Sequence, residues 1–405
     1  MTILKLALQG YTSSFRGLSR DIWILALVML VNRVGAMVLP FMTIYLTSSL
    51  HFSLSQAGFV MGAYGAGSIA GSYLGGQLTD KFNYYSVQLW SLVGSALLLF
   101  VFPILTEFWT ITLCILFFSF VSDMLRPANS VAIAAYAKDE NRVRSFSLMR
   151  LSINLGFAVG PAIGGLIAGT IGYTWIFIFD GVTCLLAAVL ILSKLKYKPP
   201  KKVQEYDNEQ VPVAPLSAYK DKKYLFFISM VMLYGILFFQ LFTSVPVFMK
   251  NISGYDEFSI GLFMALNGLL IVLIEMPLIQ RLEKKPNVFS FITYGFILIS
   301  LSFIILLLNP MNILFSLAFI FFITTSEMFA MPFMLNFAVN RSSIGRQGQY
   351  MALYAMGYGM AHIIAPTVSM YIADSFGFQS LYIGVSILAL IGGYTFYKLI
   401  KAGYW

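Results

Sequence analysis

The sequence predicts an all-α membrane protein in which twelve transmembrane helices form two pseudo-symmetric six-helix bundles. Three observations predict this class. The composition is 59% hydrophobic and 11% charged, with a mean hydropathy of +0.81, whereas a soluble protein carries about 25% charged residues. Twelve long apolar stretches follow one another, each close to the roughly 20 residues that cross one hydrocarbon core. A polar linker divides them into two sets of six.

The twelve stretches should all be helices, because only helices and closed barrels satisfy backbone polar groups in lipid. Barrel strands would be about ten residues long and would alternate in polarity, and these stretches do not. The expected spans cover residues 21–48, 55–79, 86–105, 108–136, 145–170, 173–195, 223–249, 258–281, 287–308, 311–338, 346–373 and 376–399.

The distribution of Lys and Arg predicts the orientation. With the N-terminus inside, the basic residues fall almost entirely on the cytoplasmic side, and the outside receives essentially only Lys250. We therefore expect a multi-pass protein of a bacterial inner membrane with both termini in the cytoplasm. The net charge of +9 is explained by the inner loops, so the expected partners are the lipid bilayer and small molecules, and no nucleic acid is needed.

The domain organisation follows from the linker. We expect an N-terminal six-helix bundle over 1–195, a cytoplasmic linker over 196–222 and a C-terminal six-helix bundle over 223–405. The linker is rich in Lys, Glu, Asp and Pro, as expected for a solvated connector.

The two halves also repeat each other. Pro127 precedes Pro161 by 34 residues, and Pro332 precedes Pro366 by the same 34. Two related halves of this kind predict a site at their interface near mid-membrane, reached by alternating access.

Ionisable residues deep inside the apolar spans are the candidate functional residues. A charge near the bilayer centre costs roughly 2.5–3.5 kcal/mol on insertion scales, and such residues usually mark a substrate or ion path. The six are Arg33, Asp123, Arg126, Glu275, Glu327 and His362.

A first motif lies between the second and third spans. It begins at Gly76 and reads Gly-Gln-Leu-Thr-Asp-Lys-Phe-Asn-Tyr-Tyr. It resembles the cytoplasmic loop signature of the major facilitator superfamily, in which Gly76, Asp80 and Lys81 match and two tyrosines replace basic residues. The resemblance covers nearly the whole chain and implies the major facilitator fold. It also implies an inner latch, with Asp80 accepting hydrogen bonds from helix ends or from arginines such as Arg144; the alternative is an ordinary solvated turn.

A second motif lies in the fifth span and is similar to the antiporter motif of drug:proton exporters within the same superfamily. Small residues at four-residue spacing allow helices to approach closely, and a proline bends the span. The alternative is generic small-residue packing. The motif residues are Gly156, Gly160, Pro161, Gly164 and Gly165.

A third pattern lies in the fourth span, where Ser119, Asp123, Arg126 and Ser130 share one helix face. Exporters of this group commonly carry an arginine in this span, and Arg126 matches. The resemblance places spans one and four at the cavity, so we expect Arg33 to interact with Asp123 across it. A carboxylate beside arginines can exchange a proton for a substrate; the alternative is a static buried salt bridge.

The second half offers further candidates. Glu327 lies in the middle of span ten, and Glu275 lies nearer the cytoplasmic third of span eight, so either could be a second proton site. His362 in span eleven either titrates near neutral pH or packs as an ordinary core residue. Tyr354 and Tyr358 share the helix face of His362 and would suit an organic substrate.

These observations lead to one functional hypothesis and two alternatives. The leading hypothesis is a secondary active transporter that exports small, amphipathic, drug-like compounds in exchange for protons, with the proton gradient as its energy source and no cofactor. The first alternative is a proton-coupled transporter of one polar solute, such as a sugar, peptide or siderophore. The second is a membrane receptor or assembly factor that transports nothing.

An enzyme is not expected. The sequence contains no phosphate-binding glycine loop, nucleophile elbow or zinc-ligand spacing. Cys114 and Cys184 are isolated and should be packing residues rather than a disulfide or metal site. One twelve-span unit should contain a complete path, so we expect a functional monomer.

Overall fold

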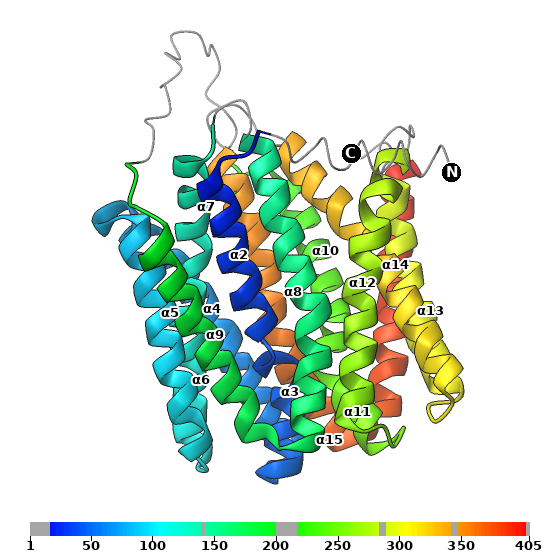
Figure 1. The fold of residues 1–405 in the computed structure, drawn as a ribbon. Helices are drawn as coiled ribbons and strands as arrows, with labels where there is room; N and C mark the ends of the chain where they lie inside the picture. Colours follow the sequence, from blue (N-terminus) through cyan, green and yellow to red (C-terminus); the bar gives the residue numbers. More distant parts are fainter. Residues whose placement is uncertain (1–16, 139–141, 200–216, 283–288, 342–346, 402–405) are drawn as a thin grey trace, which may run out of the picture.

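The structure is a computed structural model that describes residues 17–138, 142–199, 217–282, 289–341 and 347–401 (Figure 1). These ranges are almost entirely helical and contain no strand. The long helices are α2 (Arg20–Gly35), α3 (Val38–Ile44), α4 (Leu54–Phe82), α5 (Tyr84–Val101), α6 (Phe108–Asp123), α7 (Leu125–Tyr136), α8 (Arg142–Thr170), α9 (Tyr173–Lys194), α10 (Lys222–Phe238), α11 (Ser244–Asn251), α12 (Glu257–Leu282), α13 (Phe289–Leu308), α14 (Ile313–Arg341) and α15 (Gln347–Lys401).

The helices agree with the predicted spans to within a few residues. Ten described segments are long and apolar enough to cross a membrane. One of them, α15, consists of two helices joined at Gly377, where φ is 81°. The glycine-rich α4 is less apolar, but its 29 residues also suffice to cross. With these two additions the predicted twelve spans are accounted for.

Part of the predicted organisation lies outside the described residues: the two termini (1–16 and 402–405) and most of the linker (200–216). The described chain leaves α9 at Lys194 and enters α10 at Lys222. We call the end of the bundle where α9 ends and α10 begins the linker side. The assignment of two separate domains stays a prediction, and "N-terminal half" and "C-terminal half" below mean α2–α9 and α10–α15.

Spans one, four and seven are interrupted, although the sequence predicts a continuous helix for each. In each span a proline is the third residue of the second helical segment: Pro40 in α3, Pro127 in α7 and Pro246 in α11. A proline has no N–H to donate to the carbonyl four residues earlier, so the helical ladder is broken there. Pro40 and Pro246 therefore break the first span of each half at corresponding positions, which is where transporters with internal repeats place their sites.

The two halves pack through two helix pairs, α8 with α12 and α4 with α15 (Figure 1). Glycines bring these helices close together. A Cβ on Gly58 of α4 would lie 2.6 Å from the carbonyl oxygen of Pro366, and one on Gly261 of α12 would lie 2.3 Å from that of Pro161. Side chains larger than hydrogen would force these helices apart.

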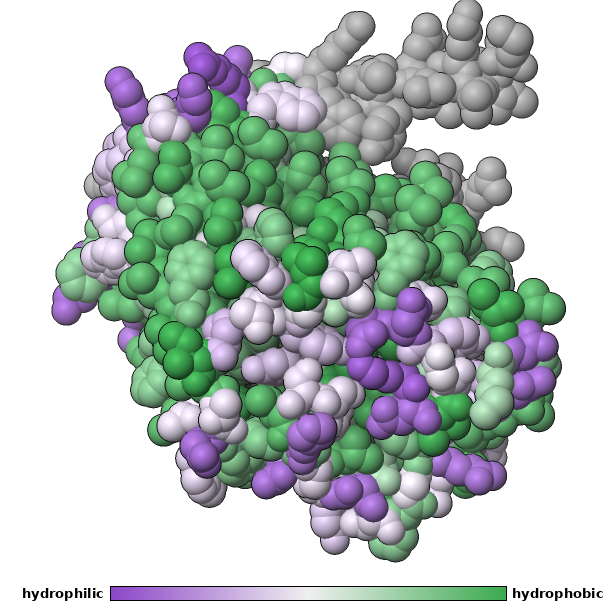
Figure 2. All heavy atoms as spheres, turned by 60° about the horizontal axis from the view of Figure 1, so that its bottom comes forward, coloured by the Kyte–Doolittle hydropathy of each residue, from purple (hydrophilic) through white to green (hydrophobic). Residues whose placement is uncertain are grey.

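The outside of the bundle suits a lipid environment. Large apolar side chains are exposed along the flanking helices, among them Leu97, Leu113 and Leu192 at 54–61%. Figure 2 shows the end opposite the linker side, where polar side chains gather and apolar side chains surround them.

Candidate functional site

The acid of span four is held by neighbours from its own half. Arg126 Nε lies 2.8 Å from Asp123 Oδ1, and the Ser68 hydroxyl of α4 donates to the other carboxylate oxygen. Asp123 is 4% exposed, whereas the Arg126 side chain is 54% exposed. The predicted interaction between Arg33 and Asp123 is not formed in this structure. Arg126 takes that place, because it lies only three positions further along span four, at the start of α7, and reaches the carboxylate directly.

Arg33 forms no ion pair with any residue that the structure describes. Its Nε is buried without a hydrogen-bond partner, and its guanidinium carbon lies 5.5 Å from the ring centre of Phe157 on α8. Arg33 lies in the last turn of α2, just before the break in span one, and its carbonyl accepts a bond from the Ala36 N–H. Its cationic group therefore lies at mid-span with no acid of the described ranges within ion-pair distance.

The glycines of the span-five motif place Arg33. A Cβ on Gly156 would lie 2.4 Å from Arg33 Cβ, one on Gly160 3.0 Å from the Val34 carbonyl oxygen, and one on Gly164 2.9 Å from Met37 Cβ. Three glycines of α8 thus form one face against span one. Gly165 and Pro161 lie on another face and pack against α12. The predicted close approach of helices is present, and α8 makes it with two neighbours, span one and α12.

The acids of the C-terminal half have different partners. Glu327 of α14 accepts a hydrogen bond of 3.3 Å from Asn267 Nδ2 and forms no ion pair within the described part of the chain. Glu275 of α12 forms an ion pair with Arg150 of α8 in the other half. The structure therefore makes Glu275 a bridge between the halves near the linker side, while Glu327 has a neutral partner.

The aromatic face predicted on span eleven is present. His362 stacks on Phe239 with ring centres 3.7 Å apart, and Tyr358 lies 6.1 Å from the same ring and 5.4 Å from Tyr354. His362 also borders a small void of about 30 Å³ between the halves, together with Tyr64 and Thr243. Phe239 opens the break in span seven, so this face meets the second interrupted helix.

The contacts expected of a latch at the loop between α4 and α5 are absent from the described ranges, so its role stays a prediction. Asp80 is exposed and has no hydrogen bond or ion pair with the residues that the structure describes, Arg144 included. Lys81 lies over the ring of Phe82, and a Cβ on Gly76 would meet nothing within 4 Å. The tyrosines that replace the basic residues of the family motif bind backbone instead: Tyr84 pairs with Lys198, and Tyr85 with the carbonyl oxygens of Ile191 and Leu195.

The polar side chains along span four differ in their exposure to solvent. Ser119 and Asp123 are buried, Arg126 is largely exposed, and Ser130 is exposed, so access increases toward the linker side. Arg150 and Phe157 share a face of α8 between those that pack on α2 and α12, and both are exposed. Among the described residues, α2 and α7 make no extensive contact with α10 or α14. The linker side is therefore the more loosely packed end of the interface between the halves.

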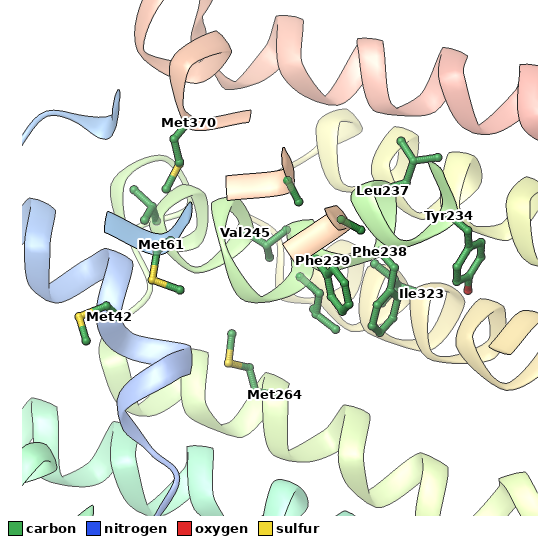
Figure 3. Close-up of a cluster of buried hydrophobic side chains, with 14 of the residues drawn as sticks. Met42, Met61, Tyr234, Leu237, Phe238, Phe239, Val245, Met264, Ile323 and Met370 are labelled. Carbon is green, nitrogen blue, oxygen red and sulfur yellow. The ribbon is translucent and has the colours of Figure 1, made fainter. Parts of the chain in front are cut away.

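The opposite side is closed by contacts between the halves. Thr43 donates to the Thr243 carbonyl oxygen at 3.1 Å, and Ser55 donates to Asp374 at 2.6 Å. Tyr173 donates to Glu257 at 2.6 Å. Buried methionines from four helices complete the closure: Met42, Met61, Met264 and Met370 (Figure 3).

Three residues of this site were missed in the sequence analysis. Arg150 is an ionisable residue inside predicted span five at the depth of Glu275, so the rule used for the other six would have found it. Ser68 and Asn267 are neutral and carry no comparable signal. They were found because the fold places them against Asp123 and Glu327.

Comparisons with known proteins agree with this architecture. The family profile described as Major Facilitator Superfamily matches residues 24–343. The chain is 27% identical to the MFS-type transporter YttB of Bacillus subtilis, over 92% of this chain and 93% of that protein. It is 23% identical to the quinolone resistance protein NorA of Staphylococcus aureus, over 88% and 90%. It is 21% identical to a Na(+), Li(+), K(+)/H(+) antiporter of Planococcus maritimus, over 89% and 91%.

Solved structures share the fold. A POT family transporter in complex with 5-aminolevulinic acid matches with a TM-score of 0.78 and 16% identity, over 95% of this chain and 97% of that one. A mutant of the nucleoside transporter NupG matches with a TM-score of 0.76 and 16% identity, over 94% and 100%. The family and these relatives are transporters, so the prediction of a membrane transporter rather than an enzyme is confirmed. The chain belongs to the Major Facilitator Superfamily.

Proposed function

We propose that this transporter exports small amphipathic organic compounds from a bacterial cell in exchange for protons. The observation that carries the proposal is Glu327, a carboxylate at mid-span with a neutral partner and no ion pair in the described structure. Such a group can gain or lose a proton without breaking a salt bridge. Asp123 would have to give up its bond to Arg126 to do the same.

The proposed cycle uses the two sides of the cavity. We place the linker side in the cytoplasm, in agreement with the distribution of Lys and Arg. The described conformation would then load substrate from the cell interior while the Thr43, Ser55 and Tyr173 contacts keep the outer side closed. Opening these contacts would expose the same site to the outside, where substrate leaves and Glu327 takes a proton. Return to the inward state would release that proton into the cell.

The walls of the cavity suit compounds with apolar and aromatic parts. Tyr354, Tyr358 and Phe239 present aromatic rings, and four methionines lie buried where the halves close (Figure 3). Methionine side chains adapt to ligands of different shape, as a site with several substrates requires. The relative NorA is a quinolone resistance protein, which supports this substrate class. A single twelve-span chain would contain the whole path and work as a monomer.

A second candidate is a transporter of one polar solute. The observation that favours it is Arg33, whose charge would suit an anionic or zwitterionic ligand. The name of the Planococcus relative adds monovalent cations to the compounds that must be tested.

The test uses sealed liposomes that contain the purified protein and a pH-sensitive dye. Acid-loaded liposomes are challenged with a quinolone, a lipophilic cation, a sugar, a dipeptide, and sodium, lithium and potassium salts. We expect proton efflux with the quinolone and the lipophilic cation, and efflux at the level of empty liposomes for Glu327→Gln. Glu107→Gln, which neutralises an exposed carboxylate before α6, is the matched control and should behave as the unmodified protein. A response restricted to the sugar, the dipeptide or the salts would overturn the proposal.

A further inference from the structure

Arg33 lies in the cavity, and among the described residues its guanidinium lacks the anionic partner that a bound ligand could supply. A buried cation without a partner costs several kcal/mol in free energy, so proteins normally pair it. Within the described residues Arg33 has no ion pair and its Nε has no hydrogen-bond acceptor. The group beside it is the ring of Phe157, an apolar surface with a weak attraction for cations.

The acids near Arg33 already have partners. Asp123 binds Arg126 and Ser68. Asp180 of α9 accepts a bond from the Val38 N–H at the start of α3 and lies 3.9 Å from the Cys184 sulfur. Neither carboxylate reaches Arg33 within ion-pair distance in this structure. Among the residues that the structure describes, no acid near Arg33 is left to pair with it, so a bound ligand could supply the counterion.

The position of Arg33 is fixed and reachable. Gly156 lets α8 touch the Arg33 backbone, where a Cβ would lie 2.4 Å from Arg33 Cβ. Arg33 itself is partly exposed, and the neighbouring Phe157 ring is 40% exposed on the cavity face of α8. A ligand that enters from the linker side can thus meet the guanidinium and the ring together.

We propose that Arg33 binds a carboxylate of the transported compound, and that Phe157 packs against an aromatic ring that carries this carboxylate. A guanidinium offers paired N–H donors that match the two oxygens of a carboxylate. This inference rests on the proposed function and names the members of its substrate class that should bind most tightly, which are aromatic acids, including zwitterions. Asp123 and Arg126 then form a separate pair that need not open when the ligand binds.

The experiment compares two ligands that differ in one charge. The first is a naphthalene with an aminomethyl group and a carboxylate, and the second is its methyl ester. Binding to the purified protein in nanodiscs is measured by calorimetry for the unmodified protein, Arg33→Gln, Arg33→Lys and the control Arg20→Gln, which removes an exposed arginine at the start of the same helix.

We expect the unmodified protein and Arg20→Gln to bind the acid about tenfold or more tighter than the ester, which is the effect of one charged hydrogen-bonded contact. Arg33→Gln should bind both compounds within about twofold of each other. Arg33→Lys should keep part of the preference, because a single ammonium is not bidentate. The ester should bind equally to all four proteins.

Several results would overturn the inference. They are equal binding of acid and ester to the unmodified protein, an acid preference that survives Arg33→Gln, or no binding of either compound. If Arg33→Gln does not purify as a monodisperse protein, the Arg33→Lys series and the unmodified protein decide alone. Because this is a binding measurement, failure of proton coupling in the liposome test leaves it readable, and the two proposals fail separately.

Discussion

The two halves of this transporter share their proline positions and differ in the chemistry beside them. Pro127 in span four corresponds to Pro332 in span ten. The acid just before Pro127 is Asp123, which is paired with Arg126, whereas the acid just before Pro332 is Glu327, which has a neutral amide partner. The repeat has kept the prolines and changed the charges, and Pro127 interrupts span four whereas α14 continues through Pro332. Among the described residues, the N-terminal half carries Arg126 in an ion pair and Arg33 outside any ion pair, and the C-terminal half carries the acid that can be neutralised without losing an ion pair.

The largest expected effect is on proton efflux, and it should differ between variants of Asp123 and of Glu327. Asp123→Asn should leave Arg126 without its partner and slow transport, yet proton efflux should still accompany substrate because Glu327 is intact. Glu327→Gln should remove proton efflux altogether. Both variants are measured in the same liposomes with the same substrate. If Asp123→Asn instead abolishes efflux and Glu327→Gln retains it, the proton site belongs to the N-terminal half.

An intermediate effect is expected for the glycine motif of span five, which has no matching glycine in span eleven. The glycine at 156 corresponds to Ala361 in the second half. Gly156→Leu should destabilise the protein by about 1–3 kcal/mol and stop transport, because the new side chain meets Arg33 at 2.4 Å and overpacks the interface. Gly169→Leu in the same helix is the control, since a Cβ there meets nothing within 4 Å. Thermal unfolding of the two variants checks this, and equal melting temperatures would contradict the role given to the motif.

The smallest effect concerns the ends of the halves on the linker side. In the C-terminal half, Asp221 before α10 accepts bonds from Arg341 and Tyr350. In the N-terminal half the corresponding tie is neutral: the Ser19 hydroxyl donates to the Tyr136 carbonyl oxygen. Burial by itself would raise the pKa of Asp221, but the hydrogen bonds from Arg341 and from the Tyr224 N–H outweigh it and hold the pKa below its usual value.

The sign of the pH effect follows from that lowered pKa. The carboxylate contributes its stability fully above about pH 4, the value of an unfolded Asp, and loses it as the pH falls through the folded pKa. We expect Asp221→Asn to cost about 1–2 kcal/mol at pH 7 and much less at acidic pH, whereas Ser19→Ala should show no such pH dependence. Amide hydrogen exchange at the start of α10 and of α2 measures how much the hydrogen bonds of Asp221 and Ser19 stabilise these two helix ends. A pH-independent loss for Asp221→Asn would show that the ion pair does not stabilise this end.

The sequence predicted the spans closely because hydropathy depends on composition along the chain, which needs no knowledge of contacts. It also predicted the mid-membrane charges, since an ionisable residue in an apolar span is visible without a structure. It did not predict the interruptions of spans one, four and seven. Pro40, Pro127 and Pro246 were visible in the sequence, but whether a proline bends a membrane helix or divides it depends on the neighbouring helices.

The pairing of charges was the part that the sequence could not determine. Arg33 and Asp123 lie at similar depths, and depth alone predicted that they interact; the structure instead pairs Asp123 with Arg126 and leaves Arg33 beside Phe157. The sequence by itself determined a chain of long apolar spans with six ionisable residues inside them, because lipid selects composition and length. Only the tertiary structure decided that Arg33 lies beside Phe157 with no ion pair among the described residues, that Glu275 pairs with Arg150 and that Glu327 has an amide partner, because these side chains lie far apart in the sequence and meet through helix packing.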